Sequence, residues 1–100
     1  MAVYVDALVR YSVEQIKPAA RRFGVDWCHM TADSESELHS FAARLGLGRA
    51  AYQGNYARPA LRHYDLTPGK RGQALRLGAV EVDARAHMLA RVNAEIAANQ

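Results

Sequence analysis

One local pattern occurs twice in this chain and restricts the folds open to it: a β-rich run, a helix-capping residue, a helical stretch and a glycine. In the first copy, residues 25–31 (VDWCHMT) are apolar on both faces, which is typical of a central strand. Ser34 and Glu37 then form an S-x-x-E capping box, and Gly46 is placed to end the helix. The helix carries an apolar stripe made of Leu38, Phe41, Ala42 and Leu45.

The second copy follows the same order. Residues 62–66 are predicted to form a strand, Thr67 is a suitable N-cap, and Pro68 occupies the first helical position, where proline is favoured. Gly78 ends this helix, and residues 79–82 give a further strand. Two strand–helix–strand units in succession favour an α/β sheet with right-handed crossovers.

Shorter signals complete the expected set of elements. Strands are predicted at residues 2–5 and 50–53, and Asp83 caps a last helix. Residues 9–24 have helical spacing, but a proline interrupts it. We therefore expect a loop there, with a short helix over residues 18–23.

The length of 100 residues sets the scale of the fold, because such a chain builds one domain with a modest core. We predict an α/β fold in which residues 1–83 form a single small domain. Its sheet is expected to be mixed, mostly parallel, and made of four to five short strands. Residues 84–100 are expected to form a C-terminal helix that packs on this domain or on a partner.

Several protein classes are excluded by what the sequence lacks. Cys28 is the single cysteine, so an internal disulfide or a multi-cysteine zinc site cannot form. No apolar run approaches the roughly 20 residues that span a bilayer, and the first residues do not resemble a secretory leader. We expect a cytoplasmic protein without a membrane partner. The net charge of +3 fits a phosphate-bearing partner but does not require one.

The run TPGKR suggests an anion-binding site at the start of the second helix. Helix N-termini attract anions, yet Lys70 and Arg71 place cations there, where the helix dipole disfavours them. A bound phosphate would relieve this conflict, with Thr67 and Gly69 offering backbone N–H groups and Tyr64 close by as a ring among arginines. The alternatives are that both cations reach solvent or pair with an acid, and that the tyrosine belongs to the core.

Three aspartates follow predicted strands. Asp6, Asp33 and Asp65 each lie at or just beyond a strand's carboxyl end, where α/β sheets bind ligands. If the strands are parallel neighbours, the carboxylates converge and suit Mg²⁺ or Mn²⁺, which can activate water against a phosphoryl group. The alternatives are local: Asp33 can cap the helix after it, and Asp65 can bond the turn amides.

Two histidines accompany these aspartates. His63 lies two residues before Asp65, so both side chains point to the same side of the strand, and His29 precedes Asp33 by four residues. We predict His29 and His63 as catalytic or metal-holding groups, against the alternative of hydrogen-bonded structural residues. His39 is expected to be structural, and His87 is expected to lie on the surface.

Several segments together resemble one known family. The opening VYVD, the segment WCHMTAD, the helix ELHSFAARLGL and the run HYDLTPGKRGQALRLGAVEV are similar to a small family from bacteria and their phages, domain of unknown function 4031. The resemblance covers most of residues 2–82. It implies no specific activity. The joining of some relatives to phosphohydrolase-like domains implies phosphate chemistry by analogy.

The sequence thus favours a domain that binds a phosphate-bearing ligand, either a nucleotide or a nucleic acid. Metal-dependent hydrolysis of a phosphoester is the enzymatic form of this hypothesis. The alternative is a protein-interaction module, in which the last helix pairs with a partner or with a second copy in a homodimer. Its apolar stripe consists of Leu89, Val92 and Ile96.

Overall fold

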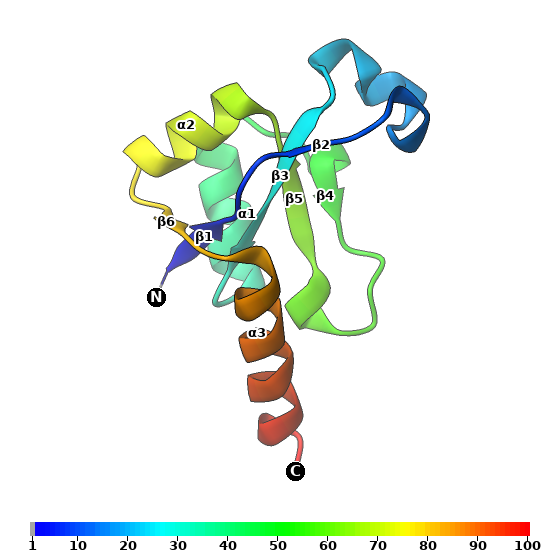
Figure 1. Cartoon of the computed structure of the whole chain (residues 1–100). Coiled ribbons are helices and arrows are strands. Elements are labelled where there is room, and N and C mark those ends of the chain that lie inside the picture. Colours follow the sequence, from blue (N-terminus) through cyan, green and yellow to red (C-terminus); the bar gives the residue numbers. More distant parts are fainter. Residues whose placement is uncertain (1) are drawn as a thin grey trace.

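The computed structural model describes residues 2–100 and contains one mixed sheet with three α-helices (Figure 1). The strands are β1 (Val3–Val5), β2 (Val9–Arg10), β3 (Asp26–Ala32), β4 (Tyr52–Gln53), β5 (His63–Leu66) and β6 (Val80–Glu81). The helices are α1 (Glu35–Arg44), α2 (Pro68–Arg76) and α3 (Ala84–Ala98). Short 3-10 helices occupy the connections, namely η1 (Val13–Gln15), η2 (Pro18–Phe23), η3 (Arg49–Ala51) and η4 (Pro59–Leu61).

The helix boundaries follow the capping residues. The Ser34 side chain accepts a hydrogen bond from the backbone N–H of Glu37 at the start of α1. Thr67 does the same for Lys70 at the start of α2, and Asp83 for Ala86 at the start of α3. The expected helices, and the short helix over residues 18–23, are therefore confirmed.

The expectation of a mostly parallel sheet of four to five strands was wrong. The sheet has six strands in the order β4-β5-β3-β1-β6, with β2 pairing beside β1 along β3. Among residues 2–100, only the β1–β6 pair is parallel. The units β3-α1-β4 and β5-α2-β6 do join strands of the same direction. However, antiparallel strands lie between their ends, as in a split βαβ arrangement.

The hydrophobic core lies between one face of the sheet and the helices α1 and α2. Alternate residues of β3 (Cys28, Met30 and Ala32) point into it, and so do Tyr64 and Leu66 of β5. The helices contribute Leu38, Phe41, Ala42, Leu45 and Ala74. The intervening residues of each strand therefore point to the opposite face, because side chains alternate along a strand.

Helix α3 lies against this opposite face and is held mainly by polar contacts. The Arg91 guanidinium donates to the carbonyl oxygens of Ala60 and Ala32, each at 3.0 Å. The backbone N–H of Ala60 donates to the Glu95 carboxylate at 2.8 Å. No residue of α3 is fully buried. Within residues 2–100, no helix has both the length and the apolar character needed to cross a membrane.

Candidate functional site

The sheet face that points away from the core carries a row of polar side chains. His29 and Thr31 of β3 and His63 and Asp65 of β5 lie there, at the positions between the core residues. The register of β3 and β5 places His29 directly opposite Asp65. Facing residues in antiparallel strands have Cβ atoms about 5 Å apart, so the fold itself brings these two side chains together.

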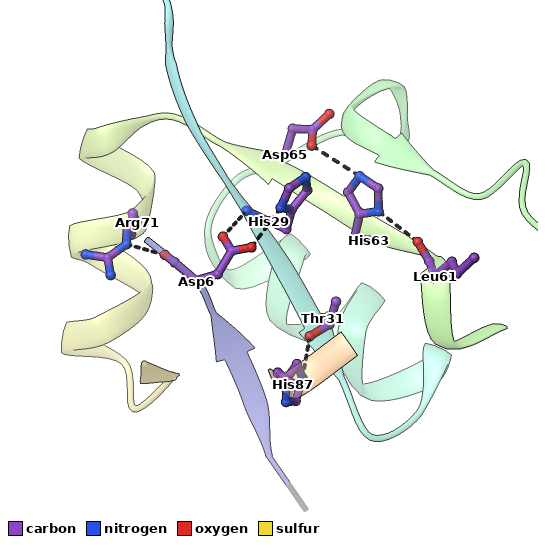
Figure 2. Close-up of polar contacts among 8 residues, drawn as sticks. All are labelled: Asp6, His29, Thr31, Leu61, His63, Asp65, Arg71 and His87. Carbon is purple, nitrogen blue, oxygen red and sulfur yellow. Dashed lines mark hydrogen bonds and ion pairs between the residues drawn. The ribbon is translucent and has the colours of Figure 1, made fainter. Parts of the chain in front are cut away.

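Asp6, the residue that directly follows β1, also lies beside this row. Its carboxylate accepts the backbone N–H of His29 at 2.6 Å and the ring Nδ1–H of His29 at 2.7 Å (Figure 2). Asp6 is 7% exposed. Burial alone would raise the pKa of Asp6, but these two hydrogen bonds outweigh it and hold the pKa below its usual value.

The carboxylate of Asp6 also acts on the His29 ring. The hydrogen bond that the His29 ring donates to the Asp6 carboxylate raises the pKa of His29 and outweighs burial, which acts to lower it. Because the carboxylate is an acceptor, Nδ1 of His29 carries the proton and Nε2 is left with its lone pair when the ring is neutral.

The His63 ring is fixed in the same tautomer. Its Nδ1 lies 2.9 Å from the carbonyl oxygen of Leu61, which can only accept a hydrogen bond. The Nε2 atom of His63 is therefore the free acceptor, and it lies 3.3 Å from a carboxylate oxygen of Asp65. Figure 2 shows the side chains of His29, His63 and Asp65 gathered beside the β3–β5 pair.

These three residues form a group that could hold a metal ion. Each offers one ligand atom, and all three atoms lie within 4.8 Å of one another. Metal-binding histidines commonly donate their other ring N–H to a carboxylate or a backbone carbonyl, as His29 does to Asp6 and His63 to Leu61. A proton between His63 and Asp65 would satisfy two of the three acceptors, whereas a divalent cation would satisfy them all.

Two of the three residues, His29 and His63, border a cleft between the sheet and the start of α3. The cleft has a volume of about 440 Å³, and His29 and His63 line it together with Asp6. Tyr4, Tyr56 and Met88 are among its apolar walls, while Arg85, His87 and Arg91 bring cationic or titratable groups from α3. Its size is in the range of small-ligand sites.

The third predicted metal ligand, Asp33, lies elsewhere. Because β1 and β3 are antiparallel neighbours, their carboxyl ends lie at opposite ends of the strand pair, and Asp33 is separated from Asp6. Its carboxylate accepts the backbone N–H of Ala2 at 2.7 Å and the hydroxyl of Tyr4 at 2.8 Å. The expected cluster of three aspartates is therefore not formed. Asp6 and Asp65 do border one site, with two histidines between them.

The cations at the start of α2 have protein partners. Lys70 donates from Nζ to the carbonyl oxygen of Leu45 at 2.5 Å, and its backbone N–H is bonded to Thr67. Arg71 donates from Nε to the Asp6 carbonyl oxygen at 2.8 Å and also pairs with Glu81. These contacts relieve the charge conflict without an anion. Gly69, also predicted to bind the anion, is exposed at the helix start.

Tyr64, expected to contact the ligand, is a core residue instead. It is 1% exposed, and its hydroxyl is bonded to the ring of His39 at 2.8 Å. A side chain without access from solvent cannot form part of the cleft.

The sequence reading missed the contribution of α3 to the site. His87, expected on the surface, lies in the cleft, 3.1 Å from the Thr31 hydroxyl and with its ring centroid 4.4 Å from that of Tyr4. The signal was present, because His87, Arg91 and Glu95 recur every four residues and form one polar stripe on the helix. That stripe faces the domain.

The fold and the site define a small α/β protein with a candidate two-histidine, one-aspartate metal centre on a mostly antiparallel sheet. The chain belongs to the family described as protein of unknown function (DUF4031), whose model matches residues 3–95. The match extends past the recognised segments and includes residues 8–24 and most of α3. Searches of the curated proteins and of the solved structures gave no match.

Proposed function

We propose that this protein is a divalent-metal-dependent hydrolase that acts on a phosphoester bond of a nucleotide or nucleic acid. The observation that carries the proposal is the group of three ligand atoms from His29, His63 and Asp65, all within 4.8 Å of one another. Nδ1 of each imidazole lies within hydrogen-bonding distance of a protein acceptor, which leaves Nε2 free to bind a metal ion. Three protein ligands leave coordination positions free, as in catalytic rather than structural sites.

The donor set bears on which cation binds. Two imidazole nitrogens with one carboxylate suit Zn²⁺ or Mn²⁺ better than Mg²⁺, which prefers oxygen ligands. A metal bound there would supply a water of lowered pKa and polarise a phosphoryl oxygen.

The remaining side chains orient the metal ligands and attract the phosphate of the substrate. Asp6 fixes the His29 ring, and Arg71 holds the Asp6 backbone from behind through its carbonyl oxygen. Arg85, exposed at the cleft, places a positive charge where a phosphate would enter.

Titration calorimetry with Zn²⁺, Mn²⁺ and Mg²⁺ tests the metal site. We expect one ion per chain, with Zn²⁺ or Mn²⁺ bound more tightly than Mg²⁺. Asp65→Asn and His63→Ala should each abolish measurable binding, while Asp6→Asn should weaken it by about 10- to 100-fold through the freed His29 ring. Asp33→Asn is the matched control, because Asp33 lies at the opposite end of the β1–β3 pair from Asp6.

Hydrolysis is then measured on the metal-loaded protein with a chromogenic phosphodiester and with short oligonucleotides. Activity should follow metal affinity across these variants. Binding that survives both Asp65→Asn and His63→Ala would refute the site. A metal-loaded protein that cleaves none of these substrates would refute the hydrolase.

The exposed face of α3 supports a second candidate, a protein-interaction module. Leu89 is 48% exposed and Ile96 39% exposed, with Val92 partly buried between them. Self-association through this stripe predicts a dimeric mass by light scattering that Leu89→Glu converts to a monomeric one. A monomeric mass for the unchanged protein would refute the homodimer.

A further inference from the structure

The net positive charge of this protein is equal to the net charge of one segment. We define the arm as residues 8–24, which include β2, η1 and η2. The arm holds four of the chain's thirteen Lys and Arg residues and one of its ten acids, so its charge of +3 equals that of the whole chain. The other residues carry nine cations and nine acids and are neutral in sum. Such an asymmetry points to an anionic partner at the arm.

The arm has a defined structure of its own. It joins the sheet through β2, whose Val9 and Arg10 pair with Trp27 and Asp26 of β3, and it extends beyond the end of that strand (Figure 1). Within the arm, the backbone N–H of Ser12 donates to the Gln15 side chain at 2.9 Å. The cationic side chains are thus displayed on a folded segment.

Aromatic rings lie among these cations. Phe23 is 53% exposed, and the Arg22 guanidinium lies 4.8 Å from its ring centroid. Trp27, partly exposed at the base of the arm, donates from its indole N–H to the Gly24 carbonyl oxygen at 3.1 Å. Exposed rings beside a basic surface are the features that bind single-stranded nucleic acid, since bases stack on the rings while cations contact phosphates.

The arm leads directly to the candidate metal centre. Trp27 precedes His29 by two residues on β3, so both side chains lie on the same face, about 7 Å apart along the strand. A strand held on the arm can therefore pass over Trp27 to the cleft.

We propose that the arm binds the backbone and bases of single-stranded nucleic acid and positions the strand at the metal centre. The role of this strand as substrate rests on the proposed function, but its binding does not. A membrane surface is the weaker match, because the exposed Leu8, Val9 and Val13 lie on no amphipathic helix: η1 has three residues and η2 has six.

Fluorescence polarisation with a labelled 12-nucleotide oligothymidine, in EDTA, tests the arm without the metal. We expect binding at low salt, with log K falling against log salt at a slope of roughly −2 for three phosphate contacts. The double variant Lys17→Gln/Arg22→Gln should weaken binding at least about tenfold and flatten the slope by roughly 1.4. It leaves Arg21 unchanged, because Arg21 donates to the Ile16 carbonyl oxygen within the arm.

The matched control is Arg44→Gln/Arg76→Gln, which removes two exposed arginines outside the arm and should bind as the unchanged protein does. Phe23→Ala should lower the affinity by about tenfold and leave the salt slope unchanged, because stacking involves no counterion release.

Four results would overturn the inference: no oligonucleotide binding at low salt, equal loss in the arm and control variants, tighter binding of a duplex, or binding only to anionic phosphatidylserine vesicles. Metal binding without oligonucleotide binding would refute this inference but leave the proposed metal centre intact. Oligonucleotide binding without metal affinity would do the reverse.

Discussion

Replacement of Arg91 by methionine should detach α3 from the sheet while leaving the rest of the domain folded. The guanidinium makes two hydrogen bonds to backbone carbonyl oxygens, each at 3.0 Å. A hydrogen bond from a charged donor contributes about 1.5–3 kcal/mol, and methionine recovers part of the packing and avoids the desolvation of a charge. We therefore expect a net loss of about 3 kcal/mol.

This loss should be local, because no residue of α3 is fully buried. Native-state hydrogen exchange is the direct assay. The backbone amides of α3 should exchange about 100-fold faster in Arg91→Met, while those of β3 change far less. Metal affinity should persist, because His29, His63 and Asp65 all come from the sheet. Arg85→Met is the control, since no hydrogen bond of Arg85 is found within residues 2–100.

Unchanged α3 amides in Arg91→Met would refute the reasoning, because they would show that contacts other than those of Arg91 dock the helix. An equal acceleration in Arg85→Met would refute it as well, since that variant removes the charge without removing the two bonds.

Three further outcomes are expected. Leu45→Ala, at a core residue 1% exposed, should lower the free energy of unfolding by about 2–5 kcal/mol in urea titrations; a loss below 1 kcal/mol would contradict the described core. Thr67→Ala should cost about 1 kcal/mol by removing the α2 N-cap, whereas Thr67→Ser should cost little; equal losses would exclude capping as the cause. Burial lowers the pKa of His87 from 6.5, so its protonation favours the unfolded state, and its share of stability is lost as pH falls through 6.5. His87→Gln should remove that acid-side loss in thermal melts at pH 5–7, and an unchanged pH profile would count against it.

The helices could be predicted from the sequence because their signals are local. Ser34, Thr67 and Asp83 each bond a backbone N–H three residues ahead, so the cap and its helix lie in one short window. The order of the strands is not local. The strand–helix–strand alternation indicated that the strands on either side of each helix run in the same direction. Which strands become neighbours depends on contacts between distant segments.

The candidate site divides in the same way. His63 and Asp65 share one strand, and their common face followed from the two-residue period alone. The distance between Asp6 and Asp33 depended on the relative direction of β1 and β3, which the sequence does not specify. The cations Lys70 and Arg71 at the start of α2 were visible in the sequence, but their partners Leu45, Asp6 and Glu81 are set by tertiary contacts.

The alternation along β3 and β5 divides the demands of packing and chemistry between adjacent residues. Cys28, Met30, Tyr64 and Leu66 fill the interior, while His29, Thr31, His63 and Asp65 point to the opposite face of the sheet. Substitutions at the second group can therefore change the candidate metal site without opening a void in the first. In a mutational scan of these eight positions, changes in the first group should lower solubility and melting temperature. Changes in the second group should instead affect metal affinity.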